Sequence, residues 1–368
     1  MEVKQQSSPW AAAVPALLSF FAILALILDA ETAVSAASAG LQLCLQTVVP
    51  SLFPFLVAAR LFTSSGAVEW CARVVGPVMG PAFGLPPQGA AALVLGLLGG
   101  YPVGAQTAAT LYGERLLTKA EAERLLAFCS NAGPAFIFGM VGGLFGSGKI
   151  AAVLFGIHIV SALLTGLIFR PRGNQVLASS GNTIRKPASK LDFSAVMTGA
   201  VKTMGLICGC IVLFQVIVAF LERALGTWMP PAVEIGLSGL LELAGGCSRL
   251  PQLEAAGLRY CMASGFLAFG GLCVWLQTKS VIAPYGLTGR YYLSGKVLQG
   301  TIAVLLTWGI QVVYPSWLPR TLPTAAFPNH AGLLRATAIV TALFLCGLGI
   351  WCLRLRKKAG KEEALDVY

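Results

Sequence analysis

The chain has 368 residues, of which 56% are hydrophobic and 11% charged, and its mean hydropathy is +0.77. Soluble proteins carry roughly 25% charged residues, so this composition excludes a soluble globular protein and predicts a helical protein that crosses a membrane several times. The net charge of +11 does not indicate nucleic-acid binding, because the basic residues stand in short runs beside apolar segments. A lipid bilayer is therefore an expected partner, and a nucleic acid is not.

Residues 1–35 are predicted to form an N-terminal transmembrane helix. Its apolar run Trp10–Leu28 is long for a signal peptide, and the acidic Asp29 and Glu31 follow it without a clear small-residue cleavage site. We therefore expect a retained first span with a cytoplasmic N-terminus.

Residues 36–170 are predicted to form a first repeat. It begins with an apolar stretch from about 38 to 62, which we expect to be broken at Pro50 and Pro54. An interfacial connector follows at 66–84. Residues 128–145 are expected to cross outward, and residues 150–169 to return.

The stretch Gly96–Gly139 is the centre of this repeat. Its two ends are too apolar for an aqueous loop and too rich in glycine and proline for a continuous helix. Within a bilayer, irregular backbone survives only where protein buries it or where it lines a cavity. Residues 86–111 either cross once or enter and leave on one side, and the basic residues that follow, such as Arg115, favour re-entry.

A basic loop at 171–192, predicted to be cytoplasmic, separates the first repeat from a second one at 193–315. In the second repeat, 193–220 and 297–313 read as outward spans, and Lys279, Arg290 and Lys296 before the latter are expected at the inner side. The segment 234–246 is too short to cross, because a span needs about 20 residues. We expect it to re-enter from the outer side. Residues 331–368 are predicted to be a last transmembrane helix with a basic, cytoplasmic tail.

The two repeats share an order of span, glycine-rich hairpin, broken span and span. Each repeat is expected to cross the membrane an odd number of times. The second repeat would therefore be inverted relative to the first. The predicted fold is all-α, with about 7–8 transmembrane helices and two re-entrant or broken hairpins. In transporters built this way, substrate binds near the membrane midplane, where the interrupted segments meet.

Glu242 is the sharpest candidate site residue, because a carboxylate in an apolar re-entrant segment is costly unless it is paired, protonated or facing water. It fits a coupling-ion or proton site, and it equally fits a helix cap or an interfacial partner of Arg249. Arg249 either complements an anionic substrate or extends to the membrane surface.

Ser130, Asn131 and Gly133 precede a broken span, where free N–H groups at a half-helix start attract anions. The same residues also fit ordinary helix capping with Pro134 at an early helical position. The further polar candidates for substrate binding are Tyr101, Gln106, Ser264 and Gln277, of which Gln277 also fits the inner interface.

The sequence predicts no enzyme, no metal site and no cofactor. His158 and His330 are the only histidines, and the ten cysteines are scattered without a Cys-x-x-Cys pair. His158 is interpreted either as a proton relay or as a buried packing residue.

Several segments together resemble the sporulation integral membrane protein YlbJ family, which belongs with the nucleoside-recognition or Gate domain proteins: Pro50–Phe55, Gly99–Ala105, Leu117–Leu126, Phe128–Gly139 and Phe266–Gln277. The resemblance covers most of residues 40–315, and it implies that the two repeats are Gate-like. It also implies similarity to concentrative nucleoside transporters.

The function implied by this resemblance is transport of a small aromatic anion, dipicolinate, across the outer forespore membrane during sporulation. Two alternatives stay open at this point: a non-transporting component of spore-envelope assembly and a nucleoside transporter. The sequence does not define the coupling ion, the direction of transport or the oligomeric state.

Overall fold

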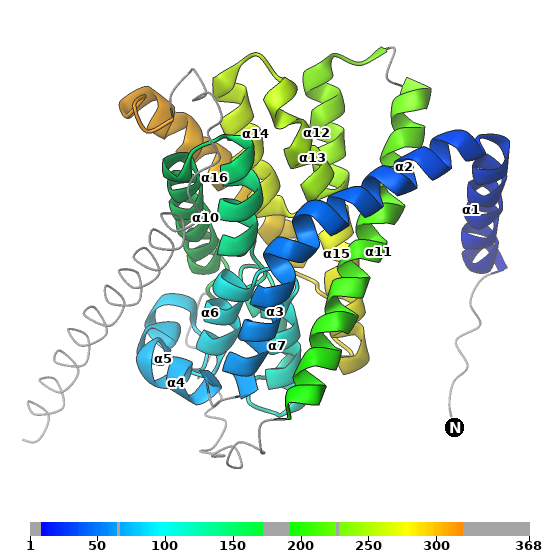
Figure 1. The fold of residues 1–368 in the computed structure, drawn as a ribbon. Coiled ribbons are helices and arrows are strands. Elements are labelled where there is room, and N and C mark those ends of the chain that lie inside the picture. The colour runs from blue at the N-terminus through cyan, green and yellow to red at the C-terminus, as the bar shows by residue number, and fades with distance from the viewer. Residues whose placement is uncertain (1–8, 65–66, 172–191, 226–227, 319–368) are drawn as a thin grey trace, which may run out of the picture.

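The computed structural model describes residues 9–64, 67–171, 192–225 and 228–318 (Figure 1). All regular elements in these ranges are helices. Five helical segments are long and apolar enough to cross a membrane: Ala30–Ala58, Gly148–Ile168, Phe193–Leu225, Ala256–Tyr285 and Tyr292–Val313. The predicted all-α polytopic membrane fold is thus confirmed. The predicted helix at 331–368 and nearly all of the loop 171–192 lie outside the described residues.

The first half of the chain contains thirteen of the described elements. In order they are α1 (Pro9–Leu28), α2 (Ala30–Leu43), η1 (Cys44–Val48), α3 (Val49–Ser64), α4 (Ala67–Val74), α5 (Gly76–Val78), η2 (Met79–Phe83), α6 (Gly89–Gly99), α7 (Val103–Gly113), α8 (Lys119–Leu125), η3 (Ala135–Val141), α9 (Gly142–Leu144) and α10 (Gly148–Ile168).

The expected break at Pro50 and Pro54 is absent, because α2, η1 and α3 follow one another as a single helical segment. The irregularity is instead a π-helical turn, η1, just before Pro50. Such a turn relieves the ladder of a helix where a proline removes a donor, and Pro54 lies inside α3. Proline therefore changes the local helix type here without ending the span.

Helices α6 and α7 form a short hairpin. Each has 11 residues, about 16 Å of helix, which is roughly half of the hydrocarbon thickness of a bilayer. The two helices pack side by side and are joined at Gly100–Pro102. The chain therefore enters and leaves this region on the same side.

The second half contains eight described elements: α11 (Phe193–Leu225), α12 (Pro231–Leu241), α13 (Leu243–Arg249), η5 (Leu250–Gln252), α14 (Ala256–Phe269), α15 (Gly271–Ile282), η6 (Ala283–Tyr285) and α16 (Tyr292–Val313). Helices α12 and α13 pack together as a second short hairpin. The segment of α14 and α15 is a span broken at Gly270, which has a left-handed φ of +85°.

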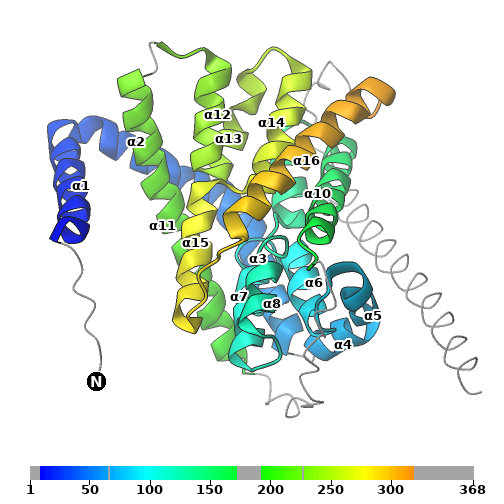
Figure 2. The same ribbon diagram turned by 180° about the vertical axis from the view of Figure 1, so that it is seen from behind.

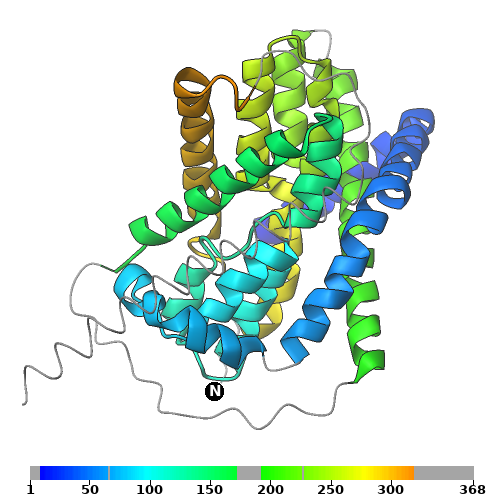
Figure 3. The same cartoon turned by 60° about the vertical axis from the view of Figure 1, so that its left-hand side comes forward.

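The two hairpins lie in opposite halves of the molecule. Helices α6 and α7 stand in its lower part and α12 and α13 in its upper part, in views from the front and from behind (Figures 1 and 2). The long α11 packs along α2 and α3, and α10 packs on α16. In Figure 3 the cyan helices of the first hairpin likewise lie below the yellow-green helices of the second.

Residues 128–145 differ from the expected span. Only residues 135–144 are helical, in η3 and α9, and the segment before them is irregular and buried. About 15 Å of helix cannot cross a bilayer alone. The reason lies in the buried surroundings, because hydrogen bonds from neighbouring helices replace the missing helical ones for part of this backbone.

The outer faces of the long helices are apolar and exposed. On α16, Leu305, Trp308 and Val312 project outward, and Leu213 does so on α11. In water such a surface would cause aggregation, whereas lipid tails solvate it. The polar residues of the chain's centre are therefore buried behind an apolar shell.

Candidate functional site

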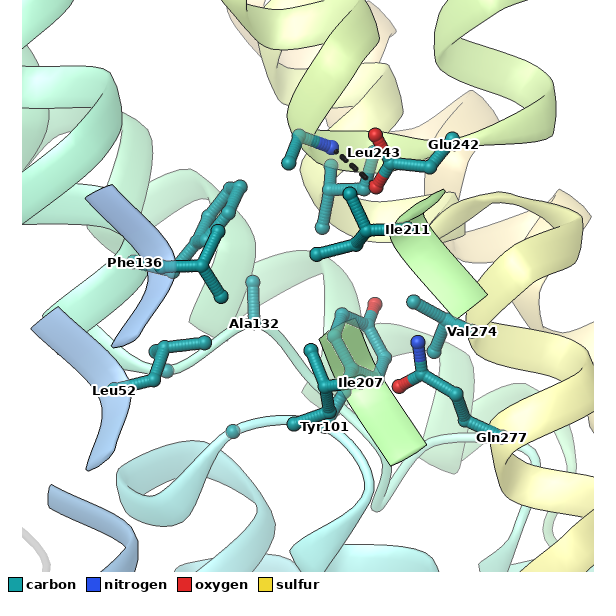
Figure 4. A pocket seen from close by; sticks show the side chains of 14 residues that line it. Leu52, Tyr101, Ala132, Phe136, Ile207, Ile211, Glu242, Leu243, Val274 and Gln277 are labelled. Atoms are coloured by element: carbon teal, nitrogen blue, oxygen red, sulfur yellow. Dashed lines mark hydrogen bonds between the residues drawn. The ribbon is translucent and has the colours of Figure 1, made fainter. Parts of the chain in front are cut away.

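A cavity of about 50 Å³ lies where the two halves meet (Figure 4). This volume has room for a few water molecules. Its wall is mostly apolar and is formed by Val48, Leu52, Gly100, Tyr101, Ala132, Gly133, Phe136, Ile207, Ile211, Glu242, Leu243, Ala244, Val274 and Gln277. Four of the predicted site residues, Tyr101, Gly133, Glu242 and Gln277, thus meet at one cavity although they come from both halves of the chain.

In each half, a hairpin tip touches the break of another segment. Gly100, whose φ is +76°, packs on Gly133, where an added Cβ would lie 3.0 Å from the Gly133 nitrogen. In the second half, an added Cβ on Gly271 would lie 3.1 Å from the carbonyl oxygen of Leu241. Interrupted backbone from two elements therefore meets on both sides of the cavity.

Tyr101 joins the tip of the first hairpin to the second half. Its hydroxyl donates to the carbonyl oxygen of Leu267 at 3.1 Å and lies 3.4 Å from that of Ala268, at the end of α14. These carbonyls belong to the last turn before the break at Gly270, so the α14 helix cannot satisfy all of them. The tyrosine ring consequently spans the boundary between the halves.

Glu242 is buried, with 3% of its surface exposed, and it caps the N-terminus of α13. Its carboxylate accepts hydrogen bonds from the backbone N–H groups of Ala244, at 2.8 Å, and Gly245. Gln215 of α11 approaches it at 3.5 Å. A negative charge is favourable at a helix N-terminus, so this geometry holds a carboxylate in the cavity wall (Figure 4).

Gln277 of α15 faces the cavity from the side opposite Ala132 (Figure 4). Its amide nitrogen lies 3.3 Å from the sulfur of Cys273, one turn earlier. A thiol is a weak acceptor, so the amide retains capacity to bond a ligand. Gln277 therefore provides a polar group in an otherwise apolar part of the wall.

Asn131 lies behind the cavity wall in a buried chain of hydrogen bonds. Its side-chain oxygen accepts from Gln299 at 3.0 Å, and its amide donates to the carbonyl of Phe128 at 2.8 Å. Gln299 in turn accepts from the ammonium of Lys296 at 2.6 Å. Together with the bond from the Ala132 nitrogen to His158 Nε2, at 3.1 Å, these contacts fix the loop 131–133 that lines the cavity.

Ser130 is fully buried beside this loop, and its hydroxyl faces those of Tyr292 and Thr278. The Tyr292 hydroxyl interacts with those of Thr278 and Ser130, although neither contact has the geometry of a full hydrogen bond in the described part of the chain. Buried hydroxyls whose hydrogen bonds are only partly formed retain donors and acceptors for a further partner. This cluster is thus suited to hold water or a polar ligand group.

The other predicted site residues lie away from the cavity wall. Gln106 accepts from Arg60 at 3.4 Å. Arg249 pairs with Glu222 and lies 3.6 Å from Glu234, so its charge is already matched in this conformation. Ser264 accepts from Thr307 at 2.7 Å, between α14 and α16.

Lys296 and Gln299 are polar residues of the centre that sequence reasoning missed. We expected Lys296 to lie at the inner surface as a flank of the last span of the second repeat, but it is 0% exposed. A usable signal was present, because a lysine and a glutamine three residues apart share one face of a helix whose other residues are largely apolar. No group of three or more His, Cys, Asp or Glu residues able to hold a metal ion occurs in the described ranges.

Comparison with known proteins agrees with this architecture. The Gate family, described as nucleoside recognition, matches residues 45–224. The sporulation integral membrane protein YlbJ of Bacillus subtilis (strain 168) is 27% identical over 385 aligned residues, covering 90% of this chain and 93% of the relative. No solved structure matches the chain.

Proposed function

We propose, from the premise that this chain belongs to the YlbJ family of sporulation membrane proteins with a Gate domain, that it transports a small aromatic anion. Dipicolinate, a pyridine ring with two carboxylates, is the substrate that we favour. The membrane is then the outer forespore membrane, with both chain termini in the cytoplasm. The proposal gives the chain no catalytic role and no cofactor.

The observation that carries the proposal is the cavity between two interrupted hairpin regions. It combines a tyrosine ring, an amide and a carboxylate within an apolar wall. Ligand sites of this kind are mainly apolar with a few placed polar groups. The cavity is too small for an aromatic ring in this conformation, so the proposed cycle includes a widening of the hairpin contacts.

Two matching features support an inverted-repeat origin of the site. In the first hairpin, Gly104 approaches the Cα of Gly96, and in the second, Gly246 approaches the Cα of Gly239. Each pair lies about one turn from its hairpin tip, which is where small residues let two helices touch. Interrupted segments in corresponding positions of two halves are typical of secondary transporters.

Uptake by the purified protein in liposomes tests this function, with dipicolinate and uridine supplied in parallel. Saturable dipicolinate uptake supports the proposal, particularly if Asn131→Ala and Gln277→Ala reduce it. Uptake of uridine in place of dipicolinate would overturn the substrate and favour the second candidate, a nucleoside transporter, to which the Gate description points.

A non-transporting role in spore-envelope assembly is the remaining alternative. It is distinguished by Glu242→Ala, because an assembly protein tolerates loss of a cavity carboxylate, whereas an ion-coupled transporter does not. Folded wild-type protein that takes up neither substrate would support the assembly role.

A further inference from the structure

Lys296 is a fully buried lysine close to the cavity, and the proposed function has so far assigned it no role. It lies in α16. Lysine is almost never fully buried without a partner, and in membrane-embedded segments ionisable residues line pathways or pair with one another. No ion pair joins Lys296 to an Asp or Glu within the ranges that the structure describes.

The known contacts of the ammonium are neutral. It donates to the amide oxygen of Gln299 at 2.6 Å and lies 5.4 Å from the ring centroid of Tyr101. An ammonium has three donors, so one amide and one aromatic face leave both charge and hydrogen-bonding capacity unmatched. Such a group is prepared to receive an anion.

Two routes connect Lys296 to the cavity. Tyr101 is part of the cavity wall and is also the ring that the ammonium contacts. The second route runs through Gln299 to Asn131, which adjoins the wall residues Ala132 and Gly133. A movement of the Tyr101 side chain would therefore open the cavity to the ammonium.

We propose that Lys296 is the counter-charge for a carboxylate of the transported anion, and that Tyr101 is the movable wall between them. This inference rests on the proposed function, because it names the group that would select anions at that same cavity. The carboxylate would occupy the unmatched side of the ammonium, and the aromatic ring of the ligand would lie in the apolar part of the cavity. Lys296 then determines specificity for charge, and the apolar wall determines specificity for shape.

A series of three pyridines tests this role: the 2,6-dicarboxylate, the 2-carboxylate and the uncharged 2,6-dicarboxamide. Their binding to detergent-solubilised protein is measured by calorimetry. The wild type should prefer the dicarboxylate over the diamide by about tenfold or more, the loss expected when a buried charge pair lacks one partner. Lys296→Met should abolish that preference, and Lys296→Arg should retain it.

Lys279→Met is the matched control. Lys279 donates to the carbonyl of Thr288 and lies 5.0 Å from the ring centroid of Trp275, so it has a comparable aromatic contact outside the cavity. Its replacement should leave the charge preference unchanged. A purely structural role for Lys296 would lower the melting temperature of Lys296→Met without changing which ligand is preferred.

The outcomes separate this inference from the proposed function. If folded Lys296→Met still prefers the dicarboxylate over the diamide, Lys296 is not the counter-charge. The proposed transport function would be unaffected by that result. The role of Lys296 is also overturned if the wild-type protein binds the diamide as tightly as the dicarboxylate, or if it binds no carboxylate. These two results can be read from the wild type alone, even if Lys296→Met does not fold. Lys296-dependent binding of the pyridine 2-carboxylate, without uptake of the 2,6-dicarboxylate in liposomes, would support the inference and overturn dipicolinate as substrate.

Discussion

At the scale of single residues, the centre of this protein contains charged and amide side chains in fixed positions. Glu242 caps a helix, Tyr101 bridges the two halves, and Asn131 is bonded through Gln299 to Lys296. Each of these groups is costly to bury in an apolar setting unless it is hydrogen-bonded or used. The other buried charged residues in the described interior are Glu121 and Glu123 of α8, and most of the remaining buried residues there are apolar.

Glu242→Gln separates the two interpretations of this carboxylate. The amide keeps an oxygen able to accept from the Ala244 or Gly245 nitrogen, but it cannot ionise. If Glu242 couples transport to protons or cations, as we expect, the variant should lose gradient-driven accumulation in liposomes while it keeps ligand exchange between equal concentrations.

The control for this prediction is Glu242→Ala, which also removes the cap and should cost about 0.5–2 kcal/mol of stability. A lower melting temperature in Glu242→Ala combined with full accumulation in Glu242→Gln would assign Glu242 to capping alone.

At the scale of elements, the glycine pairs of the two hairpins decide how closely the helices approach. A methyl group on Gly96 would meet the carbonyl oxygen of Cys129, and one on Gly239 would meet the ring of Phe266. Backbone cannot move as cheaply as a side chain. Gly96 is therefore more sensitive to added volume than Gly239.

Gly96→Ala should destabilise the protein by about 1–3 kcal/mol, the usual cost of overpacking, as measured by thermal unfolding in detergent. Gly239→Ala should cost less, because the far end of the Phe266 side chain can shift through a change in its χ1 dihedral. Gly156→Ala in α10 is the matched control, since no atom lies within 4 Å of its added methyl. It should be neutral or slightly stabilising, because alanine favours helix more than glycine does. Equal melting temperatures for Gly96→Ala and Gly156→Ala would contradict the close packing of the hairpin.

Glycine composition made the hairpins predictable from sequence, because small residues near a turn directly permit close helix contact. The prolines were misleading: Pro50 and Pro54 predicted a broken span, whereas η1 accommodates them within one helical segment. The expected span at 128–145 also differs, because tertiary hydrogen bonds such as the one from Ala132 to His158 replace helical ones. Such bonds join residues far apart in the chain and leave no local signal.

The residues of the candidate site were also predictable from sequence only in part. Tyr101, Glu242 and Gln277 stood out as polar residues in apolar segments, and the structure brings them to one cavity. Lys296 was interpreted as a flank, because hydropathy along the chain does not tell which face of a helix points inward. Arg249 was a reasonable counter-charge in sequence, but its pairing with Glu222 depends on the packing of α13 against α11.

At the scale of the whole molecule, the two hairpins divide the interior between them. Each is too short to cross a bilayer, and they lie in opposite halves of the fold (Figures 1 and 2). Their tips meet the cavity, so water or ligand reaching the tips from the two membrane faces would arrive at the same place. Such an arrangement lets alternate movement of two hairpins expose one site first to one side and then to the other.

This arrangement predicts a specific pattern of accessibility from the two sides. In a variant lacking the ten native cysteines, single cysteines replace Pro87 and Glu114, which flank the first hairpin, or Pro230 and Gln252, which flank the second. All four positions are exposed. We expect a membrane-impermeant maleimide to label the first pair from the cytoplasmic side only, because Arg115 and Lys119 follow that hairpin. The second pair should be labelled only from the opposite side.

Leu305→Cys on the lipid-facing surface of α16 is the control and should resist the reagent in intact membranes, because thiols react as thiolates in water. Labelling of Pro87→Cys and Glu114→Cys from opposite sides would mean that α6 and α7 together cross the bilayer, and the re-entrant hairpin would be refuted. Labelling of both pairs from one side would retain two hairpins but place their mouths on the same membrane face. Access to the cavity would then be from that face alone, and transport by alternating hairpin movement would be excluded.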